Sequence, residues 1–135
     1  MMHGDGKRGN LGFEDCNDHT KIFWFIKKEF IEELLKKHNH PYSLIYFASC
    51  YSSYGDLNES SLTFLTINSG LSQYAIGFNG SMGSEKTLPT FAETFYTHFF
   101  KGDSIEEAFY KAVLKLKTDN NTYWYKPTLY KTVTA

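Results

Sequence analysis

The run from Leu44 to Phe47 limits the possible folds more than any other stretch of the chain. It is short, apolar and contains β-branched and aromatic residues, with Pro41 before it and small polar residues and Gly55 after it. A run of this kind between helical segments predicts a buried β-strand. Cys50 follows at the carboxyl end of this strand, which is where open α/β sheets place their sites.

The rest of the chain alternates between helical and extended patterns. Residues 3–15 contain four glycines and predict a loop with a short extended piece at Leu11–Phe13. Apolar spacing, caps and glycine stops predict helices over Lys21–Lys37, Leu62–Gly70, Phe91–Phe100 and Ser104–Leu116. Further strands are expected at Tyr74–Phe78 and in the aromatic segment Thr122–Tyr130. Because Pro127 lies inside that last segment, it should form an edge or late strand.

Strands that alternate with helices of this length imply a mostly parallel sheet, because parallel strands need crossover connections. We therefore expect an α/β fold, a three-layer sandwich with helices on both faces of the sheet. The 135 residues, 41% of them hydrophobic, are enough for one core and too few for two ordinary domains. A single domain over residues 1–135 is the expectation, and it can be a partial one.

Composition excludes several functional classes. The formal net charge is −1 and no block of lysine or arginine occurs, so neither a nucleic acid nor an anionic membrane is an expected partner. No apolar run approaches the roughly 18 residues of a membrane span, and the first residues lack a signal-peptide profile, which favours a cytoplasmic protein. With only Cys16 and Cys50 present, one reactive cysteine is a better hypothesis than a disulfide framework. No cofactor and no metal site is expected.

Several segments, taken in order, resemble the caspase-like cysteine peptidases, and among them the CHAT (caspase HetF-associated with TPRs) domains. The resemblance covers nearly the whole chain. It rests on the His3-Gly4 loop, the strand from Leu44 to Cys50 with Ala48-Ser49 before the cysteine, the strand Tyr74–Gly80, the aromatic helix Phe91–Phe100 with the residues 102–108 that follow it, and the closing segment Tyr123–Pro127.

The resemblance implies a cysteine endopeptidase with a His3 and Cys50 dyad. The interval between the two residues is close to the roughly 50 residues quoted for caspases. A thiolate attacks the peptide carbonyl and forms a thioester, while an imidazole serves first as base and then as acid. The backbone N–H groups of Gly4 and Cys50 are the expected oxyanion donors, and a protein or peptide is the expected substrate.

Departures from the family leave other interpretations open. Only Met1 and Met2 precede His3, where the family has two or three strands, so we expect a caspase-like sheet that lacks its first strands. The segment Ser43–Ala48 would then form an exposed edge without proline or lysine, which predicts self-association or a partner chain that completes the sheet. A non-catalytic interaction module with an incomplete caspase-like fold is the alternative function, with Cys50 as a buried small hydrophobe. A flavodoxin-like ligand binder is a third hypothesis, resting on a loose phosphate-loop candidate at residues 77–83.

Overall fold

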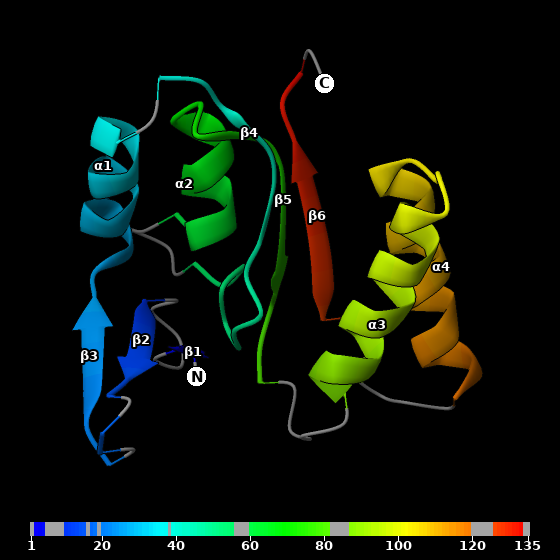
Figure 1. Ribbon diagram of the computed structural model, residues 1–135, viewed down its shortest axis with the longest axis horizontal. Coiled ribbons are helices and arrows are strands. Elements are labelled where there is room, and N and C mark those ends of the chain that lie inside the picture. Colours follow the sequence, from blue (N-terminus) through cyan, green and yellow to red (C-terminus); the bar gives the residue numbers. More distant parts are fainter. Residues whose placement is uncertain are drawn as a thin grey trace.

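The computed structural model describes residues 2–4, 10–15, 17–18, 20–37, 39–55, 60–81, 87–119 and 126–133. These residues form two three-stranded sheets and four helices (Figure 1). In chain order the elements are β1 (Met2–Gly4), β2 (Leu11–Glu14), β3 (Ile22–Phe25), α1 (Lys27–Lys37), β4 (Tyr42–Tyr46), α2 (Leu62–Asn68), β5 (Ser72–Phe78), α3 (Thr87–Phe100), α4 (Ile105–Thr118) and β6 (Pro127–Lys131). At this level the predicted mixed α/β architecture is confirmed.

The strands β1, β2 and β3 form an antiparallel sheet, called sheet A, in that order. The extended piece expected at Leu11–Phe13 is confirmed as β2. Two other expectations are wrong, because the start of the predicted loop forms β1 and the helix predicted from Lys21 begins only at Lys27. The aromatic run before Lys27 has high β-propensity, and β2 offers it a pairing partner, with Phe13 opposite Phe23. Asn10 then accepts a hydrogen bond from the Lys27 N–H through Oδ1 at 3.1 Å, at the start of α1.

The strands β4, β5 and β6 form sheet B, with β5 in the middle. β4 runs parallel to β5, with Leu44 opposite Tyr74, whereas β6 runs antiparallel to β5, with Pro127 opposite Phe78. The predicted edge position of the proline-containing strand is confirmed. Among the described strand pairs only β4–β5 is parallel, so the expected mostly parallel sheet is wrong for this part of the chain. The short connections within sheet A allow only antiparallel pairing.

Helices cover both faces of sheet B (Figure 1). Side chains of a strand alternate between the two faces. Ile76 and Phe78 of β5 belong to one buried cluster with residues of α3 and α4. A Cβ added to Gly77, between them, would meet the side chain of Thr63 in α2, so α2 lies on the opposite face. A second buried cluster on that side joins α1, α2 and β2.

The helices α3 and α4 pack against each other beside sheet B. Gly102, in the turn that joins them, has a φ of 108°, a backbone conformation that residues with a side chain rarely adopt. The predicted capping box is confirmed, since the Ser104 hydroxyl accepts from the Glu107 N–H at 3.1 Å and the Glu107 carboxylate accepts from the Ser104 N–H. None of the helices within the described residues is long and apolar enough to cross a membrane.

Candidate functional site

Cys50 lies in a turn beyond the carboxyl end of β4. Phe47 continues the pairing with β5 through a hydrogen bond of 2.8 Å from its N–H to the Ile76 carbonyl. The chain then reverses, and the Tyr51 N–H donates to the Gly80 carbonyl at 3.0 Å. The turn that holds Cys50 is therefore fixed by backbone hydrogen bonds on both sides, at the rim that the sequence predicted.

The chain reverses at Tyr51, directly after Cys50. Tyr51 has a φ of 60°, and it is the one described residue other than glycine with a positive φ. The left-handed conformation costs an L-residue roughly 1 kcal/mol, so it persists only where surrounding contacts hold it. After the reversal, the Ser53 N–H donates to the Phe78 carbonyl at 3.0 Å. The chain therefore lies beside β5 again, beyond the end of β4. Strain of this kind gathers at functional sites, which makes this turn a candidate.

The Cys50 side chain is half-buried and packs against the cluster between β5, α3 and α4. Tyr46, at the end of β4, lies in the same cluster with ring centroids 6.0 Å from Phe78 and 5.6 Å from Tyr96. Its buried hydroxyl has no hydrogen-bond partner among the described residues. Burial, and then the nearby Tyr96, raise the pKa of Tyr46 well above its ordinary value. One side of the turn is therefore apolar and aromatic.

The other side of the turn is polar and is held by serine and threonine hydroxyls. Ser52 donates its hydroxyl to the Ser49 carbonyl at 2.9 Å and accepts from the Phe78 N–H at 2.9 Å. The Ser52 hydroxyl is thereby the hydrogen-bond acceptor for the Phe78 N–H, a backbone donor at the end of β5. All three residues are buried, so each of these groups would be costly to leave unpaired.

Four more hydroxyls extend this arrangement to α2 and β6. The Ser53 and Thr63 hydroxyls are 2.8 Å apart, and Ser61 and Thr63 are 3.2 Å apart. Thr128 of β6 donates to the Ser53 hydroxyl and lies 3.3 Å from the Gly77 carbonyl oxygen. We call Ser52, Ser53, Ser61, Thr63 and Thr128 the hydroxyl network. It connects the Cys50 turn, α2 and β6 across one face of β5.

Gly77 makes room for the hydroxyl network. A Cβ at this position would lie 2.5 Å from Thr63 Cγ2, 2.6 Å from Ser53 Oγ and 2.7 Å from Ser52 Oγ. No side chain fits without displacing these groups. The hydroxyl network was not predicted from the sequence, although a glycine inside a strand often marks a place where other groups approach closely.

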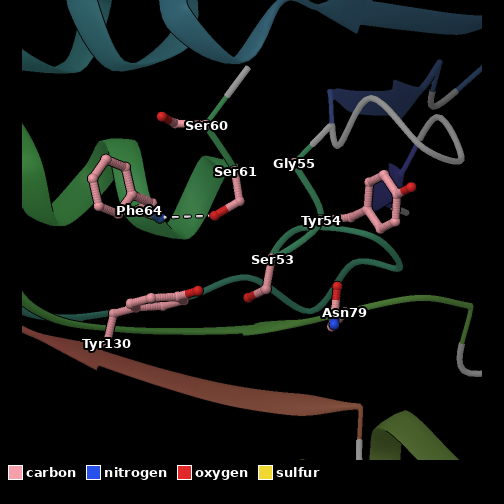
Figure 2. A pocket seen from close by; sticks show the side chains of 8 residues that line it. All are labelled: Ser53, Tyr54, Gly55, Ser60, Ser61, Phe64, Asn79 and Tyr130. Atoms are coloured by element: carbon pink, nitrogen blue, oxygen red, sulfur yellow. Dashed lines mark hydrogen bonds between the residues drawn. The ribbon is translucent and has the colours of Figure 1, made fainter. Parts of the chain in front are cut away.

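An open pocket of about 460 Å³ lies next to the hydroxyl network, on the α2 side of sheet B. Figure 2 shows the rings of Phe64 and Tyr130 on one side of it and Tyr54 and Asn79 on the other, with Ser53 between them. Gly55, Ser60 and Ser61 complete the lining. Among the described residues, hydroxyl, amide and aromatic groups line this space. Three of the lining residues, Ser53, Tyr54 and Gly55, follow Cys50 closely in the chain. None of the lining residues was predicted to belong to a site.

His3 and Gly4 lie in β1 of sheet A, where they pair with Gly12 and Leu11 of β2. Figure 1 draws β1 in the lower half of the view, the half in which β5 has its carboxyl end. The His3 side chain is outside the described residues, and so are Cys16 and His19. The predicted contact between His3 and Cys50 therefore stays a prediction. The loose phosphate-loop candidate is part strand, since Gly77 and Phe78 belong to β5, and its residues 82–83 lie outside the described part.

Within the part of the chain that the structure describes, no group of three or more His, Cys, Asp and Glu residues could hold a metal ion. A scan against protein-family models found no match, and a search of curated proteins found none either.

Proposed function

We propose that this protein is a cysteine endopeptidase of the caspase-like, CHAT type, with Cys50 as its nucleophile. One observation carries the proposal. Cys50 lies in a strained and hydrogen-bonded turn beyond the carboxyl end of a strand that pairs in parallel with its neighbour. Open α/β sheets place catalytic groups at this position, and small neighbours such as Ser49 leave space for a substrate.

His3 completes the proposed dyad. Its imidazole takes the Cys50 proton, the thiolate attacks the peptide carbonyl, and the leaving amine receives the proton from the imidazolium. Water then hydrolyses the thioester and releases the acid product. The N–H groups of Gly4 and Cys50 are the proposed donors to the oxyanion, because neither a glycine nor a tight turn hinders the approach of the carbonyl oxygen.

The wider architecture supports a caspase-like, three-layer fold. The buried clusters on the two faces of sheet B are those that such a sandwich requires. Among the described strands β4 pairs only with β5, so its other edge is where further strands of a caspase-like sheet would pair. A thiol nucleophile of this kind is suited to a reducing cytoplasm.

The substrate is a protein or peptide, and the pocket next to the hydroxyl network is the proposed place for one of its side chains. The hydroxyl and amide groups of its described lining can hydrogen-bond to a polar side chain, and its aromatic rings can pack against an apolar one. Some caspase-like peptidases that cleave after basic residues carry an aspartate two positions before the cysteine. This chain has Ala48 at that position, so no preference for a basic residue is expected.

The experiment is a cleavage assay with a mixed peptide library read by mass spectrometry, together with iodoacetamide labelling of both cysteines. We expect new peptide ends with the wild-type chain and none with Cys50→Ala or His3→Ala. Near neutral pH Cys50 should be alkylated about tenfold faster than Cys16, because a nucleophile held beside a general base is more reactive than an isolated thiol. Cys16→Ala is the matched control and should cleave like the wild type.

Equal labelling rates for the two cysteines, unchanged by His3→Ala, together with an uncleaved library, would contradict the proposal. That outcome would favour the second candidate, a non-catalytic interaction module. Among the described strands, β3 and β4 each have one edge with no partner strand, and β3 has exposed aromatic side chains. Both features support this candidate.

A further inference from the structure

β3 and the residue after it carry four consecutive large apolar side chains that are about half exposed. The exposed fractions are 57% for Phe23, 48% for Trp24, 45% for Phe25 and 55% for Ile26. We call these four residues the β3 patch. Figure 1 draws β3 at the outer left edge of the molecule, away from sheet B. Because side chains alternate between the two faces of a strand, Phe23 and Phe25 lie on one face of β3 and Trp24 on the other, so this edge is apolar on both faces. Single exposed apolar residues are ordinary, but a group of this size along one edge marks an interaction surface.

The backbone at the outer edge of β3 is also open. The Asp15 N–H donates to the Lys21 carbonyl at 3.0 Å, so residues 15 and 21 form a hydrogen-bonded pair. Such pairs alternate along an antiparallel ladder, which directs the N–H and C=O groups of Ile22 and Trp24 away from β2. No described residue bonds to these groups on that side. β3 therefore presents both apolar side chains and unpaired main-chain groups at one edge.

Between Ile22 and Ile26 the edge carries none of the features by which proteins prevent strand pairing, and the exposed Lys21 precedes this segment. Such edges usually contain a lysine, a proline or a bulge. The sequence from Ile22 to Ile26 has no charged residue and no proline, and its register with β2 is regular. The adjacent Lys27 does not protect the edge, because it is buried with 4% of its surface exposed.

We propose that β3 pairs with β3 of a second copy of this chain, antiparallel and around a twofold axis near Phe23. Ile22 of one copy then faces Trp24 of the other, and these are the residues whose main-chain groups point outward. The two Phe23 side chains meet at the axis, and Lys21 lies opposite Phe25 rather than opposite a like charge. Identical edges satisfy such an isologous interface without any further partner, and sheet A becomes one sheet of twice the width.

The size of the patch predicts a reversible dimer. At roughly 200 Å² for each large side chain, the exposed fractions leave roughly 400 Å² of apolar surface per copy. Two copies would bury roughly 800 Å² from this source, below the roughly 1,200 Å² at which stable specific interfaces begin. The main-chain hydrogen bonds between the strands add to this, so we expect a dissociation constant in the micromolar range.

The test is sedimentation equilibrium of the full chain from about 5 to about 500 μM, a range that brackets a micromolar dissociation constant. Phe23→Lys places two like charges opposite each other at the axis. Ile22→Pro removes an N–H that faces the open edge and leaves the ladder to β2 intact. Tyr110→Lys is the matched control, because Tyr110 is a 62% exposed aromatic residue on α4, outside the β3 patch.

The wild type and Tyr110→Lys should approach the mass of a dimer as concentration rises. Phe23→Lys and Ile22→Pro should associate at least about tenfold more weakly, with circular dichroism showing unchanged secondary structure in each variant that is compared. A wild type that stays monomeric at the highest concentration, or two folded edge variants that dimerise like the wild type, would overturn the proposal. So would dissociation by Ser43→Lys alone, because that result would assign the interface to the edge of β4.

Discussion

Sheet A and sheet B have the same number of described strands, but they differ in how their apolar residues are covered. In β5 of sheet B, Phe78 is fully buried between helices, whereas Phe23 in β3 of sheet A is 57% exposed. The run from Ile22 to Ile26 is at least as apolar as β5. Burial thus follows from which elements pack against a strand, and an apolar sequence does not ensure it. An uncovered apolar strand is a surface for association.

The largest expected effect in this comparison comes from removing one ring on each sheet. Phe78→Ala should lower the free energy of unfolding by about 4 kcal/mol, because it opens a cavity among Tyr46, Phe91 and their neighbours. Phe23→Ala should cost less than about 1 kcal/mol in the monomer, because its ring is already half in water. Urea denaturation at low protein concentration measures both. Similar losses for the two variants would show that sheet A is as well packed as sheet B.

A smaller effect on the free energy of unfolding is expected when one glycine in each sheet is replaced by alanine. Gly77→Ala should cost about 2 to 3 kcal/mol, because the new Cβ meets three buried groups of the hydroxyl network that cannot move apart. At Gly12 the new Cβ would lie 2.7 Å from Ile22 and 2.9 Å from Trp24, but the Trp24 ring is half exposed and can turn away. Because the partly buried Ile22 must also shift, Gly12→Ala should cost about 1 to 2 kcal/mol, less than Gly77→Ala.

Thermal unfolding of the two glycine variants beside the wild type gives this comparison directly. Gly70→Ala is a useful reference, because Gly70 has a φ of 80° and a Cβ there meets nothing within 4 Å. Its cost reports backbone strain alone. If Gly77→Ala were no more destabilising than Gly70→Ala, the close packing of the hydroxyl network would be contradicted.

The smallest effect concerns the polar contact between α4 and sheet B. Glu106 accepts from the Tyr74 hydroxyl at 3.0 Å and from Lys131 at 3.3 Å, and these bonds, Tyr74 first, lower the pKa of Glu106. A carboxyl whose pKa is lower in the folded state stabilises the fold above its unfolded pKa, and this contribution is lost as pH falls through the folded value. Stability should therefore decrease slightly between about pH 5 and pH 3.

Denaturant midpoints of the wild type and of Glu106→Gln over this pH range measure the contribution. The variant should depend less on pH than the wild type, although Asp103, whose pKa is lowered by Lys111, will retain part of the dependence. Identical pH profiles for the two proteins would show that Glu106 makes no such contribution.

Local signals in the sequence were enough for the elements around sheet B. The apolar run before Cys50, the strand ending at Phe78, the capping box at Ser104 and the edge position of Pro127 were all predictable, and all four are found. Each depends on residues close together in the chain, whose periodicity, cap or backbone chemistry acts within a few positions. The position of Cys50 at the rim followed from the same local pattern.

Only the tertiary structure decided the features that depend on distant partners. The segment from Ile22 to Phe25 has apolar spacing that also fits a helix, and it becomes a strand because β2 pairs with it. The hydroxyl network and its pocket combine residues from the Cys50 turn, α2, β5 and β6, which no spacing in the sequence relates. Periodicity reports which side of an element is apolar, whereas pairing and coverage depend on contacts between segments far apart in the chain.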